Sequence, residues 1–238
     1  MDYSLLSKVI AASRNSPRCS VYLELGCQPL KYYLIGKRLM FLHYILGRPT
    51  SELISQVFYA QLESPGKNDW TLQIIEDLKL IGLGHYTMEN IKSMSKESFK
   101  KLVKEKCAEL AFTDLMKEKE EKSKMKNLLY DKLTMQEYLM TDKLNSQQKK
   151  LIYKIRTRMI ETPDCYGRNE TCQLCNLARD EMSHVIDCVV IKLACPLVYQ
   201  CENVKVEDAY EGTNMEKLKQ LAVVYTKAWR IREQLLSQ

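Results

Sequence analysis

Four side chains that can bind a metal ion lie within 17 residues, in the segment CQLCNLARDEMSHVIDC. They are Cys172, Cys175, His184 and Cys188, in the pattern Cys-x2-Cys-x8-His-x3-Cys. Two intervening residues let a tight turn point both thiolates at one ion, and a four-residue step on a helix places an imidazole and a thiolate on the same side. Because three thiolates and one imidazole fill a tetrahedral shell, the spacing predicts a structural zinc site with no position for a reactive water.

Other interpretations of the cysteines stay open at this stage. The four residues could be buried apolar cysteines beside an ordinary polar histidine, and Cys165 could replace one ligand. We expect the loop from Asp164 to Val190 to depend on zinc, since metal binding supplies folding free energy in small sites of this kind. Core or free thiols are the predicted state of Cys19, Cys27, Cys107, Cys195 and Cys201.

Positive charge is concentrated directly before these cysteines. Between Lys143 and Ile160 there are six basic residues and no acidic residue. On a predicted helix over 146–159, Lys150, Lys154 and Arg158 repeat every four residues and form one basic stripe. A cationic helix beside a metal site can follow a phosphate backbone, so the segment predicts a nucleic-acid partner; a solvated helix face is the alternative. The candidate contacts are Lys149, Lys150, Lys154, Arg156 and Arg158.

The composition favours helices, because the 238 residues include only 8 Gly and 6 Pro while 45% are hydrophobic. We predict an all-α protein, an irregular helical bundle with a small zinc-knuckle subdomain near the C-terminus and a final long helix. The predicted domains are a helical domain over 1–142, a basic helix with the knuckle over 143–200, and a C-terminal helix over 201–238 that packs on the body.

Apolar periodicity and stop signals place the individual helices. The run VYLELG after Ser20 is assigned to a helix, although six residues also fit a strand. The other predicted helices cover 3–12, 29–46, 51–62, 70–80, a charged stretch from about 95 to 127, 133–140, 146–159 and 214–236.

Aromatic residues lie among basic ones in the helix that begins near Pro29. Such residues could stack on nucleobases, although core packing is the commoner role of aromatics at helical spacing. The aromatic residues are Tyr32, Tyr33 and Tyr44, and the basic residues are Lys31, Lys37, Arg38 and Arg48.

The cysteine usage predicts a reducing compartment, because the nine cysteines are odd in number and the first residues, MDYSLLSKVI, lack a signal-peptide pattern. The longest apolar stretch, from Leu39 to Leu46, is far shorter than the roughly 20 residues of a membrane span. We therefore expect an intracellular protein of the nucleus or cytoplasm, without a membrane partner. The net charge of +6 suits an acidic partner.

No group of residues predicts an active site. His43 lies in the apolar run RLMFLHYIL and His85 in a Gly-rich turn, while His184 is assigned to zinc. No histidine is left beside a Ser or Cys nucleophile pattern, and there is no Gly-rich phosphate loop. We predict a protein that is not an enzyme and has no small-molecule substrate.

The chain contains the run YLELGCQPLKYYLIGKRLMFLHYILGRPTSELISQVFYAQLESPGKNDW, and later the segments MSKESFKKLVKEKCAELAF, KSKMKNL, QEYL and KIRTRM. With the Cys-Cys-His-Cys knuckle, they resemble the region after the polymerase domain in polyproteins of non-LTR (LINE-type) retrotransposons, over about residues 5–190. The resemblance implies thumb-like and linker helices and a zinc knuckle that hold template RNA and target DNA near a reverse transcriptase. It also implies Cys172, Cys175, His184 and Cys188 as ligands and Lys154, Arg156 and Arg158 as backbone contacts.

The chain departs from that family in lacking a Tyr/Phe-x-Asp-Asp motif, and with it the paired aspartates that hold two metal ions for nucleotide transfer. It also has no recognisable endonuclease. A fragment, a decayed copy and a host protein made from one all stay open. We predict a nucleic-acid-binding module that prefers RNA to DNA and could partner a reverse transcriptase chain. The alternatives are a protein-interaction scaffold in which zinc only staples helices, and a polymerase piece active only with a separate catalytic chain.

Overall fold

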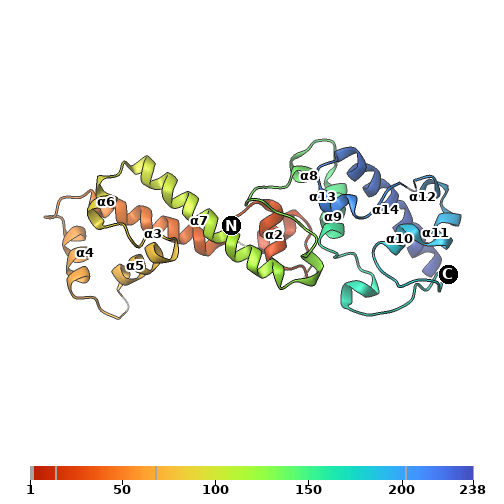
Figure 1. The fold of residues 1–238 in the computed structure, drawn as a ribbon, viewed down its shortest axis with the longest axis horizontal. Coiled ribbons are helices and arrows are strands. Elements are labelled where there is room, and N and C mark those ends of the chain that lie inside the picture. The colour runs from red at the N-terminus through yellow and green to blue at the C-terminus, as the bar shows by residue number, and fades with distance from the viewer. Residues whose placement is uncertain (1–2, 14, 68, 202, 238) are drawn as a thin grey trace. The chain divides into compact units, whose positions relative to one another are not determined.

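The computed structural model describes residues 3–13, 15–67, 69–201 and 203–237, and the regular elements there are all helices (Figure 1). Extended pairing in these residues is limited to two isolated bridges, Leu25 with Met135 and Thr171 with Arg179. The all-α prediction is therefore confirmed. Across the described ranges, no helix is both long enough and apolar enough to cross a bilayer.

The chain forms two compact units, which differ from the three domains expected from the sequence. Unit 1 comprises Gln28–Asp114, and unit 2 joins the described residues up to Cys27 to those from Leu115 onward. The N-terminal segment belongs to unit 2 because its backbone pairs with later residues. Gln136 N, for example, donates to Glu24 O at 3.0 Å. Unit 1 is thus an insertion between two chain segments that fold together.

Unit 1 is built around α3, a helix that contacts α4, α5 and α6. Its core includes Leu39, Leu42 and Ile74, which are fully buried. Arg38 donates to the buried Asp77 from Nε at 2.6 Å and from Nη2 at 2.9 Å, and this bidentate pair ties α3 to α5. The elements are α3 (Leu30–Leu46), α4 (Leu53–Glu63), α5 (Trp70–Leu80), α6 (Met88–Ser93) and the part of α7 (Lys96–Glu120) up to Asp114.

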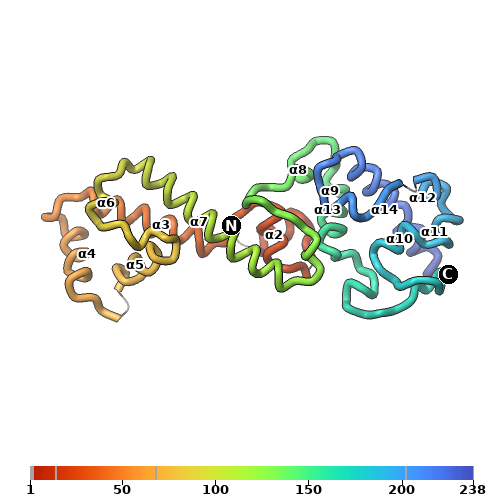
Figure 2. The backbone as a smooth tube through the Cα atoms, in the orientation of Figure 1, coloured from red at the N-terminus to blue at the C-terminus, as the bar shows by residue number. Residues whose placement is uncertain are grey.

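Unit 2 is organised by its final helix, α14, which contacts α9, α10, α11, α12 and α13 (Figure 2). The buried face of α14 includes Leu218, Leu221 and Tyr225, as its apolar stripe predicted. The elements of unit 2 are α1 (Tyr3–Val9), α2 (Arg18–Leu25), η1 (Ser123–Met125), α8 (Glu137–Met140), α9 (Ser146–Arg156), η2 (Pro163–Tyr166), α10 (His184–Asp187), α11 (Val189–Ala194), α12 (Pro196–Gln200), α13 (Asp208–Glu211) and α14 (Met215–Leu236).

A buried charge cluster lies in the core of unit 2. The Glu24 carboxylate is fully buried and accepts hydrogen bonds from Arg156 Nε at 3.0 Å, from Tyr138 Oη at 2.8 Å and from Tyr130 Oη. Burial raises the pKa of Tyr130 and Tyr138 well above the ordinary value, so both hydroxyls stay protonated and donate. The cluster fastens α2, α8 and α9 to one another through charge-assisted hydrogen bonds.

Candidate metal centre and the neighbouring basic helix

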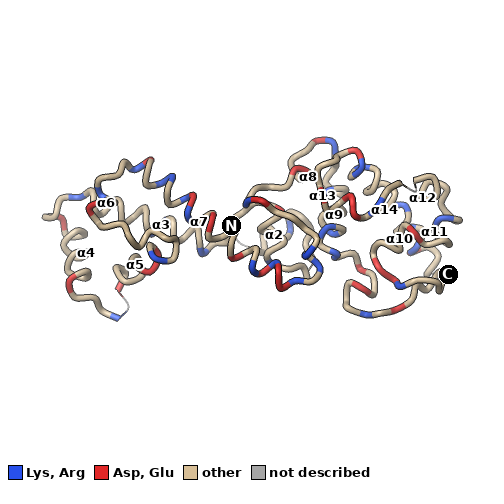
Figure 3. The backbone as a smooth tube through the Cα atoms, in the orientation of Figure 1, with Lys and Arg blue, Asp and Glu red and all other residues tan. Residues whose placement is uncertain are grey.

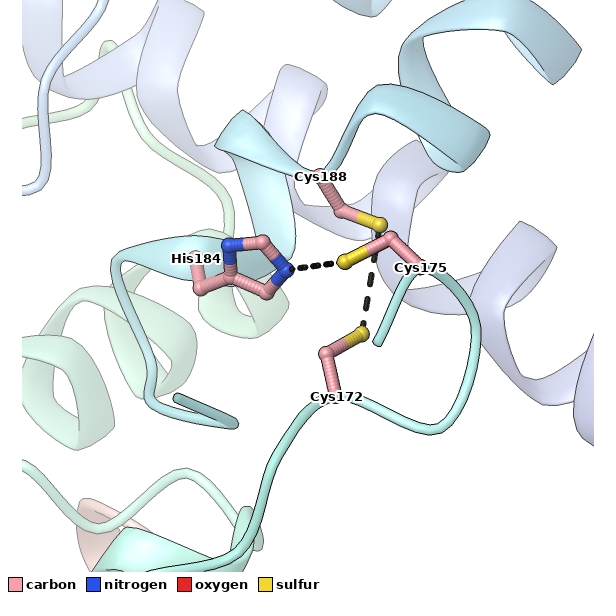
Figure 4. Close-up of side chains that lie close together, drawn as sticks. All are labelled: Cys172, Cys175, His184 and Cys188. Atoms are coloured by element: carbon pink, nitrogen blue, oxygen red, sulfur yellow. Dashed lines mark hydrogen bonds between the residues drawn. The ribbon is translucent and has the colours of Figure 1, made fainter. Parts of the chain in front are cut away.

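The four predicted ligands come together in unit 2. The ligand atoms of Cys172, Cys175, His184 and Cys188 all lie within 4.8 Å of one another, and Figure 4 shows the side chains converging. Cys175 Sγ is 3.2 Å from His184 Nε2, and Cys172 Sγ is 3.9 Å from Cys188 Sγ. A tetrahedral zinc ion separates its sulfur and nitrogen ligands by about 3.5–3.8 Å, a value that follows from the usual bond lengths. The four residues can therefore hold a metal ion.

A tight turn positions the first two cysteines. Asn176 N donates to Cys172 O, and Cys172 N donates to Ala178 O, each at 2.8 Å. Asn176 adopts a φ of 55°, a left-handed conformation that asparagine tolerates better than most residues. Leu177 N points at Cys175 Sγ, 3.5 Å away, so a backbone dipole faces the sulfur that would carry negative charge. The backbone hydrogen bonds of this turn thus hold both thiols in place.

One helical turn positions the other two ligands. His184 begins α10, and Cys188 N donates to His184 O at 2.7 Å, so the imidazole and the thiol stand one turn apart. Val185 and Ile186 bury the opposite side of this short helix, which contacts α14. A helix of only four residues is not stable alone, so its packing on α14 fixes the second half of the ligand set.

Burial distinguishes a metal site from a group of core cysteines. Cys172 and Cys188 are fully buried, as core thiols would be, but Cys175 and His184 are partly exposed and still point toward the same centre. Packing alone gives no reason for that convergence. Cys165 is not one of the converging residues, although its backbone carbonyl accepts a hydrogen bond from Lys124.

A buried ion pair lies near Cys172 of the candidate metal centre, and it was not predicted from the sequence. Arg232 of α14 donates from Nη2 to Asp180 Oδ2 at 2.6 Å, and both side chains are buried. Burial lowers the pKa of Arg232, but Asp180 and then the nearby Cys172 side chain raise it above its ordinary value overall. Arg232 Nη1 and Asp180 Oδ1 are buried without a hydrogen-bond partner within the described residues. A signal existed in the sequence, because Arg232 follows Ala228 by four residues on the apolar side of α14.

Three of the predicted phosphate contacts, Lys149, Lys150 and Lys154, lie on α9, which Figure 3 marks with blue positions. All three are partly exposed. Lys149 Nζ donates to Leu139 O at 2.9 Å, which leaves its charge unneutralised. Neither Lys150 nor Lys154 forms an ion pair with any residue that the structure describes. These three cations remain available to an anionic partner.

The prediction for Arg156 was wrong. Its side chain is only 1% exposed and is held by Glu24, while its Nη1 donates to the Ala209 and Tyr210 carbonyls. A charge neutralised inside the core cannot reach a phosphate group in solvent. The segment has no acid of its own, but the fold brings Glu24 to Arg156 from 132 residues away.

The basic stripe also ends earlier than predicted. Helix α9 stops at Arg156, and Arg158 has a φ of 52°, so it does not continue the four-residue repeat from Lys154. Arg158 Nε instead donates to Tyr210 Oη at 3.2 Å, with the guanidinium 6.0 Å from the ring centroid. Arg158 carries no carboxylate partner among the described residues, so it stays a candidate contact beside α9 rather than on it.

Comparisons of the chain with protein-family models, with curated proteins and with solved structures gave no match. The resemblance to the post-polymerase region of LINE-type retrotransposons therefore stays a prediction. Unit 2 combines two features that bear on function: four converging residues that can hold a metal ion and a cationic helix.

Proposed function

We propose that this protein is a non-catalytic, zinc-stabilised module that binds nucleic acid, with RNA preferred to DNA. The observation that carries the proposal is the convergence of four soft ligand atoms within 4.8 Å in the unit that also contains α9. Converging thiolate and imidazole ligands suit zinc better than magnesium or calcium, which prefer oxygen. Four protein ligands leave no open position, so the metal has a structural role.

The metal centre supports the basic helix through α14. Helix α10, which carries His184, contacts α14, and α14 contacts α9. An ordered metal site therefore holds α14 at one end while the same helix supports Lys149, Lys150 and Lys154 of α9. Lysine side chains on a fixed helix contact phosphates without reading base sequence. The expected binding is therefore mainly electrostatic and sensitive to salt.

Replacing Lys149, Lys150 and Lys154 together with Gln is expected to weaken RNA binding about tenfold at 0.1 M salt. The slope of log affinity against log salt should fall by about 0.7 for each phosphate of a single strand that the variant no longer neutralises. Fluorescence anisotropy of a labelled RNA over a series of salt concentrations measures both quantities. The matched control replaces the three exposed α7 lysines 100, 101 and 104 with Gln, which removes the same charge elsewhere.

If the zinc-loaded chain binds no RNA at low salt, the scaffold function replaces this proposal. Equal reductions of affinity in the α9 and α7 variants would show that net charge, and not the α9 surface, attracts the RNA. If adding this chain restored activity to a truncated polymerase, the polymerase-piece alternative would gain support instead.

Arg232 is expected to tune the metal site. One zinc ion with three thiolates and one neutral imidazole carries a net charge of −1, and the Arg232 guanidinium, although paired with Asp180, also lies near the Cys172 sulfur and stabilises its thiolate form. We expect Arg232→Met to weaken zinc binding about 10- to 100-fold, the usual cost of losing an outer-shell partner. Competition with a chromophoric chelator measures the change. Arg230→Met is the control, because Arg230 is exposed on the same helix, and an equal loss of zinc affinity there would contradict the assignment.

A further inference from the structure

The solvent face of α3 in unit 1 carries aromatic and basic residues instead of the usual polar ones. Tyr33, Lys37, Phe41 and Tyr44 follow one another at intervals of three or four residues, which places them along one face, and Arg48 lies against Tyr44 in the turn that follows the helix. All five are exposed, and the three rings are 46–54% accessible to solvent. Scattered exposed apolar residues are common, but a continuous row on one helix indicates a binding surface.

Two of these rings form a supported platform. Phe41 and Tyr44 have ring centroids 6.0 Å apart and planes inclined by only 11°. The Phe41 ring also meets Trp70 of α5 edge to face, with centroids 5.4 Å apart, and Trp70 packs in turn on Phe58. Phe41 is therefore braced from the interior of unit 1 while nearly half of its surface stays open to solvent.

A groove with positive charge lies beside this platform. It has a volume of 570 Å³, and its lining includes Met40, Phe41, Tyr44, Arg48 and Lys96. The Arg48 guanidinium lies 4.4 Å from the Tyr44 ring centroid. Arg48 Nη1 also lies 3.7 Å from Glu52 Oε1 in an exposed ion pair. Because an exposed ion pair contributes little free energy, another anion can replace Glu52 at small cost.

The charge pattern of the surface selects an anionic partner. Lys31 and Arg38 of α3 are neutralised by Asp114 and Asp77, but Lys37 forms no ion pair within the described residues, and Arg48 pairs only with the exposed Glu52. Lys37 Nζ lies 5.2 Å from the Tyr33 ring centroid, so a second cation and ring pair repeats the arrangement at Tyr44 and Arg48. Flat rings between cations match a ligand that alternates flat bases with phosphates.

We propose that this surface, formed by Tyr33, Lys37, Phe41, Tyr44 and Arg48, binds single-stranded nucleic acid. Bases stack on Phe41 and Tyr44, while Lys37 and Arg48 contact phosphates. A duplex fits poorly, because its bases already stack on one another and cannot reach the rings. The site belongs to unit 1 and the metal centre to unit 2, and this inference rests on the proposed function only in sharing its class of ligand.

Trp70 provides a direct reporter, because the Phe41 ring packs against it. The chain has two tryptophans, so Trp229→Phe leaves Trp70 as the only one, and selective tryptophan excitation then reports on Trp70 alone. Oligo(U) titrated into this zinc-loaded chain should change the Trp70 emission. In that background, Phe41→Leu and Tyr44→Leu should each lower the affinity for oligo(U) about tenfold, whereas the affinity for a duplex of the same length should fall less than about twofold.

Two control variants separate stacking from other effects. Tyr44→Phe keeps the ring and should keep the affinity for oligo(U), whereas Tyr44→Leu keeps apolar volume without the ring. Tyr199→Leu removes a ring that is 60% exposed in unit 2 and should change nothing. Circular dichroism and thermal melting of each variant check that unit 1 stays folded.

Unchanged affinity for oligo(U) in both leucine variants would overturn the proposal. The proposal would also be overturned if polyglutamate displaced oligo(U) from the α3 surface as effectively as unlabelled oligo(U) does, with Trp70 emission as the readout. An acidic polypeptide supplies charge without bases, so that result would identify a protein partner. The two proposals fail separately. If the α3 variants lose single-strand binding and the α9 variants do not, the function proposed for α9 is wrong and this inference stands; the opposite pattern overturns this inference alone.

Discussion

Removing zinc is expected to unfold the segment from Asp164 to Val190 while leaving unit 1 folded. Structural zinc binding is worth about 10–16 kcal/mol in small sites near pH 7, which exceeds the net stability of most domains. The four converging residues span this segment, and few helical hydrogen bonds support it, because its helices are short. A strong chelator should therefore abolish amide-exchange protection there, and protection in α14 should fall as well because α14 packs on α10.

Amide hydrogen exchange measured by mass spectrometry, with and without the chelator, tests this expectation segment by segment. Cys175→Ser should reproduce the loss of protection, since it removes one ligand. The matched control is Cys165→Ser, which changes a nearby thiol outside the converging set. Full protection after verified metal removal, or equal effects of both substitutions, would contradict the structural role assigned to the metal.

Arg156→Met is expected to destabilise unit 2 by about 3–5 kcal/mol, because it leaves the Glu24 carboxylate buried without its cation. The loss of hydrogen bonds to the Ala209 and Tyr210 carbonyls adds to the effect. Combining it with Glu24→Gln should recover a large part of the stability, since the second change removes the uncompensated charge. Urea unfolding followed by far-UV circular dichroism measures each free energy.

Lys150→Met serves as the control, because Lys150 lies on the same helix without a buried acidic partner. We expect a change below about 0.5 kcal/mol there, as for most surface substitutions. The opposite pattern, a stable Arg156→Met chain that has lost RNA affinity, would restore Arg156 as a phosphate contact and contradict the buried role.

The sequence alone determined the features that depend on near neighbours. The long helices α3, α4, α5 and α14 were predictable from local periodicity, and α3 was bounded by Pro29, Gly47 and Pro49, whereas the short helices α6, α11, α12 and α13 were not predicted. The metal ligands were predictable too, because one turn and one helical step set their geometry within 17 residues. In both cases the sequence pattern that carries the prediction spans only a few residues of chain.

Only the tertiary structure decided which charged residues face solvent. Arg156 looked like its basic neighbours in sequence, but Glu24 approaches it across 132 residues and draws it into the core. Arg232 likewise meets Asp180 across 52 residues. No local pattern encodes such partners, because burying a charge is decided by whether a distant opposite charge and hydrogen-bonding groups compensate for the loss of water.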